Sequence, residues 1–154
     1  EGVATVVYRL FEIVRPDEAY FGLKDYQQFL VIRNMVKDLQ LPIKVIGMPI
    51  IRDHDGLALS SRNQYLNETE RQEALILSGT LNKVISILNN RKSNLAEAKR
   101  FIAETLKDPR WNYLELRDGE NLSPDVSHSK VVTLLGVFQL RTTRLLDNAQ
   151  VEIR

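Results

Sequence analysis

The chain has 154 residues, which suffices for one ordinary domain or two small ones with a buried core. Its 21 Lys and Arg residues nearly balance its 20 Asp and Glu residues, so the charge does not favour a nucleic-acid or membrane partner. The absence of cysteine excludes disulfides and thiolate sites. No apolar run approaches the roughly 18 residues of a membrane helix, and the start lacks a signal-peptide layout. We therefore expect a cytoplasmic protein.

The first 50 residues alternate between helical and strand patterns. Apolar residues recur at helical spacing over residues 2–14, although their β-branched content would also suit a strand. Residues 18–21 predict a buried strand that ends at Gly22, and residues 43–50 predict a second strand. A helical link between these strands implies that they are parallel. Ligands collect at the carboxyl ends of such strands.

The helix between the two strands has a recognisable start. Asp25 stands three residues before Gln28, which is the spacing of a capping box. An apolar face follows, and the helix is expected to end at Leu41 and Pro42.

The pattern changes near Leu66. Asn67 and Glu70 form a further capping pair before a long amphipathic helix, and residues 94–106 predict a second helix. Residues 111–117, 131–140 and 143–147 predict three strands. Helices followed by strands without alternation indicate an α+β unit. We therefore expect one domain over residues 1–66 and a small α+β domain over residues 67–154, with residues 51–63 as the loop between them.

Polar stretches follow both predicted strands of the first part. The first covers residues 22–28 and the second covers residues 56–63, which include Ser60, Ser61, Arg62 and Asn63. Backbone N–H groups, two hydroxyls and a guanidinium fork together suit phosphate oxygens. The bland alternative for the second stretch is a polar loop with a Ser-Ser turn.

These stretches and their surroundings resemble the pantoate–β-alanine ligase (pantothenate synthetase) family. The matching segments are residues 2–7, 20–28, 56–63 and 143–148, so the resemblance covers essentially the whole chain. The family's His-x-Gly-His loop has no counterpart, which indicates a C-terminal portion of the enzyme. The implied fold class is α/β: the C-terminal part of a Rossmann-like nucleotidyltransferase domain, then a small α+β domain with two long helices and a three-stranded antiparallel sheet.

The resemblance implies an ATP-dependent, AMP-forming condensation of pantoate with β-alanine through a pantoyl adenylate. Such chemistry needs the carboxylate held in line with the α-phosphorus and the phosphate charge stabilised. Mg²⁺ is expected with ATP, bound chiefly through the phosphates. The implied partners are the small-molecule substrates, with neither nucleic acid nor membrane, and the full-length enzyme is expected to be a homodimer. No catalytic residue is assigned here, because the family's histidine pair is missing, and residues 1–154 alone are expected to be inactive.

The resemblance also implies individual roles. The expected ATP-binding residues are Gly22, Leu23, Lys24, Asp25, Ile51, Leu59, Ser60, Ser61 and Arg62, and the expected pantoate-binding residue is Gln28. Lys24 and Ser60 to Arg62 would hold the phosphates and Asp25 the ribose, while Ile51 and Leu59 would line the nucleotide pocket. Leu23 departs from the family, which usually has Glu at this position, so a carboxylate beside the phosphate site is lost.

Each role has a structural alternative. Lys24 would be a solvated surface residue, and Asp25 and Gln28 would only cap a helix. Arg62 would pair with Asp53 or Asp55. Arg52 is a weaker phosphate-binding candidate than Arg62, His54 and His128 are interpreted as surface residues, and residues 143–148 as structural.

Two other functions stay open. The chain could be a non-catalytic lid or interaction module, in which case mutation of Arg62 or Lys24 would leave nucleotide affinity unchanged. It could also belong to another adenylate-forming nucleotidyltransferase, since Ser-Ser-Arg resembles a phosphate loop of that superfamily. The choice of substrate distinguishes such a nucleotidyltransferase from a pantoate–β-alanine ligase.

Overall fold

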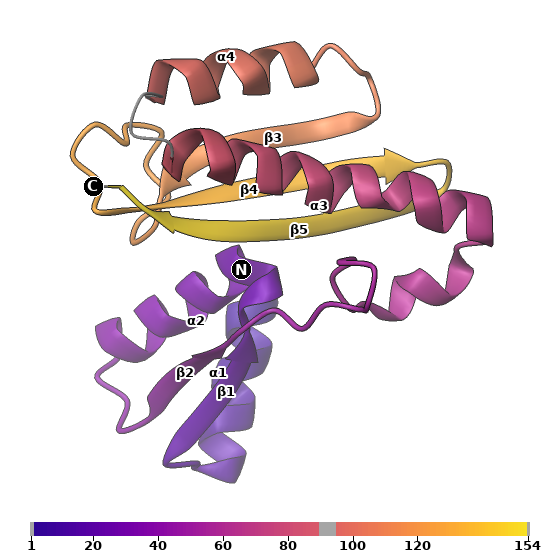
Figure 1. Ribbon diagram of the computed structural model, residues 1–154. Helices are drawn as coiled ribbons and strands as arrows, with labels where there is room; N and C mark the ends of the chain where they lie inside the picture. The colour runs from indigo at the N-terminus through magenta and orange to yellow at the C-terminus, as the bar shows by residue number, and fades with distance from the viewer. Residues whose placement is uncertain (1, 90–94, 154) are drawn as a thin grey trace. The chain divides into compact units, whose positions relative to one another are not determined.

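The computed structural model describes residues 2–89 and 95–153 and divides the chain into two compact units, Glu1–Ile50 and Ile51–Arg154 (Figure 1). Each unit contains a hydrophobic core of its own.

The first unit is a two-stranded parallel sheet with helices. Its elements are α1 (Gly2–Val14), β1 (Glu18–Gly22), the 3-10 helix η1 (Leu23–Asp25), α2 (Tyr26–Asp38) and β2 (Lys44–Met48). Strands β1 and β2 pair in parallel, with Gly22 opposite Met48. The predicted helix over residues 2–14 and the parallel strand pair are thus confirmed. Because both strands end at one edge, η1 and residues 49–50 leave the sheet from the same side.

A small apolar core holds this unit together. Phe11 of α1 packs with Ile32 and Val36 of α2, and the Phe11 ring meets the Phe21 ring edge-on at 6.5 Å between centroids. The prediction that β1 is buried was wrong, since its residues alternate between exposed and half-buried. Successive side chains of a strand point to opposite faces, and Ala19 and Phe21 lie on the face that packs against the core, so Glu18 and Tyr20 stay exposed.

The start of α2 also differs from the prediction. Asp25 occupies the N-cap position but makes no side-chain cap hydrogen bond, so the expected capping box with Gln28 is absent. The reason is that η1 runs directly into α2 and gives Asp25 a ψ of 62°, outside the extended region typical of a capping residue. Helix α2 ends at Asp38, before the Leu41-Pro42 pair.

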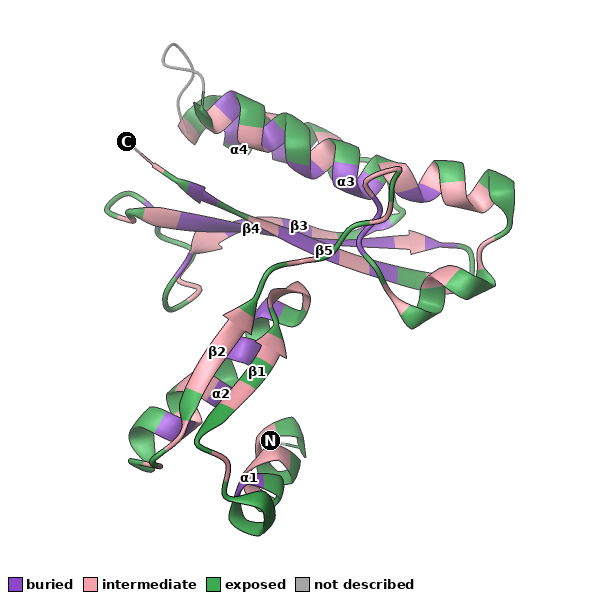
Figure 2. Cartoon of the chain, turned by 60° about the horizontal axis from the view of Figure 1, so that its bottom comes forward, coloured by how far each residue is buried: buried purple, intermediate pink, exposed green. Residues whose placement is uncertain are grey.

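The second unit packs two helices against one face of an antiparallel sheet (Figures 1 and 2). Its elements are the 3-10 helix η2 (Ser61–Tyr65), α3 (Glu68–Asn89), α4 (Leu95–Thr105), β3 (Trp111–Asp118), β4 (Val131–Leu140) and β5 (Thr143–Glu152). The strand order is β3-β4-β5, so the expected fold class is confirmed. Strand β5 extends beyond the predicted end at residue 147, and the predicted helix start at Asn94 lies outside the described residues.

Local signals in this unit act as expected. The Glu70 N–H donates to Asn67 Oδ1 at 2.9 Å and the Asn67 N–H donates to Glu70 Oε2 at 3.0 Å, which confirms this capping box. Helix α3 buries Leu77, Leu81 and Val84 in the main core, where Trp111 and Phe138 pack edge to face at 5.1 Å. None of the helices in the described part of the chain combines the length and apolar character that a membrane crossing requires.

The compact units divide at Ile50, before the domain boundary expected near Leu66. The connecting loop belongs with the second unit because Leu57, only 3 % exposed, is part of that unit's core, and Leu66 packs against it. The sequence boundary near Leu66 remains a prediction, but the contacts of residues 51–66 are with the α+β part.

Candidate functional site

Residues 51–59 form a short hairpin that precedes the Ser-Ser-Arg segment. The Leu59 N–H donates to the Ile51 carbonyl at 2.9 Å and the Asp53 N–H to the Leu57 carbonyl at 2.8 Å. The turn at its tip uses Gly56 at φ +92°, a conformation that suits glycine. The hairpin places Ile51 and Leu59 opposite each other, and these two expected nucleotide-lining residues are 68 % and 49 % exposed.

The tip of the hairpin is fixed to α3 by Arg71. Its Nη2 contacts Asp53 Oδ2 at 2.6 Å and its Nε contacts Asp55 Oδ2 at 2.7 Å, so one guanidinium joins two carboxylates of the turn. The Leu57 N–H donates to the other Asp55 oxygen at 3.1 Å. The backbone N–H of His54 donates to Asp53, and its exposed ring lies against the same carboxylate.

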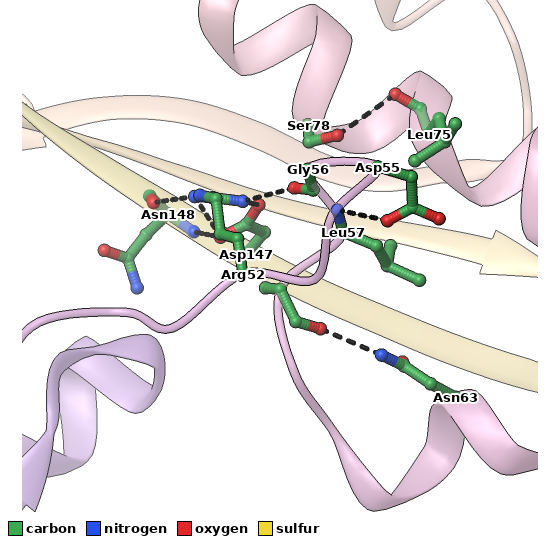
Figure 3. Close-up of polar contacts among 10 residues, drawn as sticks. Arg52, Asp55, Gly56, Leu57, Asn63, Leu75, Ser78, Asp147 and Asn148 are labelled. Atoms are coloured by element: carbon green, nitrogen blue, oxygen red, sulfur yellow. Dashed lines mark hydrogen bonds and ion pairs between the residues drawn. The ribbon is translucent and has the colours of Figure 1, made fainter.

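The base of the hairpin is fixed to β5 by Arg52 (Figure 3). Its Nη1 donates to Asp147 Oδ2 at 2.6 Å and its Nη2 to Asp147 Oδ1 at 3.0 Å, a two-pronged ion pair with a carboxylate that is only 2 % exposed. Nη1 also donates to the Gly56 carbonyl at 3.1 Å. The Arg52 fork is therefore committed to the protein, which argues against its weaker assignment as a phosphate ligand.

The Ser-Ser-Arg segment begins η2. Ser60 is its N-cap, with its hydroxyl oxygen accepting from the Arg62 N–H at 3.3 Å, and Asn63 Nδ2 donates back to the Ala58 carbonyl at 3.0 Å. Ser61 and Arg62 are exposed. No salt bridge within residues 2–89 and 95–153 involves Arg62, so its alternative pairing with Asp53 or Asp55 was wrong. Those carboxylates take Arg71 instead.

In the first unit, the expected site residues follow β1. Gly22 ends the strand, Lys24 is half-buried in η1, and Asp25 and Gln28 are exposed. Asp25 makes no side-chain cap hydrogen bond, so the alternative that its carboxylate only caps the helix was wrong. Its role as a ribose ligand stays a prediction.

Leu23 has a clear place in this unit. A Cβ added at Gly47 of β2 would lie 2.6 Å from Leu23 Cδ2 and 3.2 Å from Phe29 Cζ, so Gly47 makes room for both side chains. Leu23, at the position where the family usually has Glu, thus packs over β2. With Leu in place of Glu at position 23, an apolar side chain next to Lys24 packs η1 against β2.

Comparisons with known proteins show the family of the chain to which the loops at residues 22–28 and 51–63 belong. The family model for pantoate-beta-alanine ligase matches residues 1–150. Pantothenate synthetase of Chromohalobacter salexigens is 47 % identical over 99 % of this chain, and that of Desulfitobacterium hafniense is 44 % identical over 98 %. The chain belongs to the pantoate–β-alanine ligase family. It spans about half the length of these relatives, 54 % and 55 % respectively.

Solved structures of pantoate–β-alanine ligases give the same picture. The pantothenate synthetase of Thermus thermophilus superposes with a TM-score of 0.87 at 42 % identity, over 96 % of this chain and 54 % of that chain. The ligase from Francisella tularensis, complexed with beta-gamma ATP and beta-alanine, has a TM-score of 0.60 at 30 % identity, over 96 % of this chain and 49 % of its own. The fold expected from the resemblance is therefore shared with ligases of this family.

Sequence reasoning missed the three ion pairs that Arg52 and Arg71 make to hold the hairpin of this ligase-family chain. Asp147 was placed in a structural strand without a partner. Leu145 and Asp147 are both buried on β5 and stand two residues apart, so the alternation of the strand puts a carboxylate on an inward face. A buried carboxylate needs a cation, and this signal could have drawn attention to Arg52.

The turn carboxylates predict a specific acid sensitivity. The His54 ring and backbone N–H, together with Arg71, lower the pKa of Asp53 from 3.8 to about 2, and the N–H of Leu57 is the first cause of the lowered pKa of Asp55, followed by Arg71. A carboxyl whose pKa is lower in the folded state stabilises the fold above its unfolded pKa, and this contribution disappears as pH falls through the folded value. We therefore expect the hairpin's attachment to weaken between pH 4 and pH 2.

Fluorescence of Trp111, the single tryptophan, measures thermal unfolding of the second unit across this range. Asp53→Asn removes the titrating group, so its unfolding midpoint should fall less steeply between pH 4 and pH 2 than that of the unmodified chain. Equal slopes in the two proteins would contradict the assigned contribution.

Proposed function

We propose that this chain forms part of an enzyme that condenses pantoate with β-alanine, using ATP and releasing AMP and pyrophosphate. The observation that carries the proposal is the Ser60–Arg62 segment, which a built hairpin presents with an exposed guanidinium that no described carboxylate pairs. Family membership supports the substrate class, and the related Francisella ligase was solved in complex with beta-gamma ATP and beta-alanine. A location in the cytoplasm belongs to the same proposal.

In the proposed first step, a pantoate carboxylate oxygen bonds to the α-phosphorus of ATP and the bond to the β-phosphate oxygen breaks. In the second step, the β-alanine amine attacks the acyl carbon, and AMP leaves with the carboxyl oxygen. Neither step requires a covalent nucleophile from the protein. The protein has to orient the reactants and stabilise phosphate charge, which preorganised donors do well.

The residues divide these tasks. Arg62, with its two-pronged donor geometry, holds phosphate oxygens together with the Ser60 and Ser61 hydroxyls. Lys24 supplies a second positive charge to the phosphates, and Asp25 accepts hydrogen bonds from the ribose. Ile51 and Leu59, both exposed, offer apolar contact to the nucleotide base. Gln28 does not form the expected capping box, and its side-chain amide donates hydrogen bonds to pantoate and accepts hydrogen bonds from it.

Mg²⁺ is proposed to arrive with ATP. Within the described residues, no three His, Asp or Glu side chains gather as a metal site, and Mg²⁺ commonly binds through substrate phosphates and water with few protein ligands. The side chains and backbone of Ser60 to Arg62 offer hydroxyls, N–H groups and a guanidinium. These hydrogen-bond donors suit phosphate oxygens, whereas Mg²⁺ prefers carboxylate and water oxygens. When bound, the ion offsets phosphate charge.

Residues 1–154 alone are proposed to lack synthetase activity, because the chain spans about half of its relatives' length. The full-length enzyme is proposed to be a homodimer. A different acid substrate is the competing outcome of the test below, and substitution of Arg62 decides between a phosphate-binding role and a non-catalytic lid role for this part.

The test uses the full chain that contains these residues, incubated with ATP, Mg²⁺, pantoate and β-alanine. We expect pantothenate and AMP in equal amounts by mass spectrometry, and incorporation of labelled pyrophosphate into ATP that depends on pantoate. Exchange with another carboxylic acid but not with pantoate would reassign the substrate. Full activity of residues 1–154 on their own would overturn the proposed inactivity of this part.

A further inference from the structure

The strongest unassigned feature is the chain of contacts that runs from β5 to the Ser-Ser-Arg segment. Asp147, 2 % exposed in its side chain, binds both Nη atoms of Arg52. The same guanidinium donates to the Gly56 carbonyl, and the Arg52 backbone pairs with Ala58 across the hairpin. One arginine thus joins the sheet, the hairpin tip and the hairpin's second strand.

The contacts continue beyond the hairpin. The Ala58 carbonyl accepts from Asn63 Nδ2 at 3.0 Å, and Asn63 lies in η2 directly after Arg62. Any shift of Ala58 therefore moves the turn that carries Ser61 and Arg62. Asn63 Oδ1 is buried and has no partner among the described residues, so the amide is oriented by this one hydrogen bond.

We propose that Arg52 and Asp147 are positioning residues that set the conformation of the phosphate-binding segment Ser60–Arg62. The proposal rests on the function proposed above. Two-pronged ion pairs fix geometry as well as charge, and a buried carboxylate holds its partner because separation would leave it unpaired. The rigid sheet then determines where Arg62 stands, although neither Arg52 nor Asp147 touches the substrate.

The test compares three variants of the full chain. Asp147→Asn keeps the shape and removes the charge, and Arg52→Lys keeps the charge and removes the fork. The control, Glu115→Gln, removes a different ion pair of the same unit, formed with Arg117 at 2.8 Å on β3. The readouts are the Kd for ATP, kcat, and the rate at which trypsin cleaves after Arg62, followed by mass spectrometry below each protein's unfolding temperature.

We expect Asp147→Asn to raise the Kd for ATP and the cleavage rate roughly tenfold, because small displacements of binding groups have large effects. Arg52→Lys should give an intermediate result and Glu115→Gln no change. If Asp147→Asn does not fold, Arg52→Lys decides with the same readouts.

A lower unfolding temperature with unchanged Kd and cleavage rate would overturn the proposal and leave the pair a purely structural role. If the unmodified chain binds no ATP, the proposed function fails, whereas the cleavage rates still decide whether the pair orders the segment. The two failures are therefore distinguishable.

Discussion

Replacing Arg62 by alanine in the full chain should lower kcat/KM for ATP by roughly 100-fold or more, the usual effect of removing one preorganised donor from a charge-stabilising site. Of the arginines around the hairpin, Arg52 is bound to Asp147 and Arg71 to Asp53 and Asp55. Arg62 is exposed, and none of the described ion pairs includes it. Its fork is thus available for phosphate oxygens.

Arg62→Lys should lose less, because an ammonium keeps the charge without the planar pair of donors. Arg100→Ala removes the same charge from an exposed position of α4 and serves as the control, with activity expected to stay unchanged. Circular dichroism should show equal thermal midpoints for all three variants, since both side chains are exposed. Retention of kcat/KM within twofold in Arg62→Ala would refute the phosphate role and favour the non-catalytic lid.

Phe138→Ala is expected to have the largest effect on stability, lowering the free energy of unfolding of the second unit by about 3–5 kcal/mol. Phe138 is completely buried on β4, its ring lies edge-on to Trp111 at 5.1 Å, and the Arg110 guanidinium stands 5.0 Å from its centre. Alanine would leave a cavity between the sheet and the helices and remove the ring contacts.

Urea unfolding followed through Trp111 fluorescence measures this loss. Ile76→Ala on α3 is the control, because Ile76 is 36 % exposed and alanine favours helices, so its midpoint should shift much less. Equal midpoints for the two variants would mean that the core does not centre on Phe138. Since Leu57 shares that core, Phe138→Ala should also loosen the hairpin.

Local rules predicted most of the fold because its signals are local. The apolar spacing of α3, the Asn67–Glu70 capping box and the apolar run of β4 each act within a few residues, and all are present in the structure. The same rules failed at Asp25, where a preceding 3-10 turn changed the backbone angle that a capping box requires. Neighbouring turns of this kind leave little trace in spacing alone.

The candidate site divides in the same way. Its loops were predicted because small polar residues follow predicted strand ends and match a family. The partners of Arg52 and Arg71 were not, because Arg52 meets a carboxylate 95 residues away and the sequence contains many possible acids. Only burial, which makes an unpaired Asp147 costly, selects among them.

The most direct test of the account is a crystal structure of the full chain with a non-hydrolysable ATP analogue and pantoate. We expect phosphate oxygens within hydrogen-bonding distance of the Arg62 guanidinium, of at least one of the Ser60 and Ser61 hydroxyls and of Lys24 Nζ, with pantoate on Gln28. Nucleotide bound elsewhere, with Arg62 turned to solvent, would contradict the central claim.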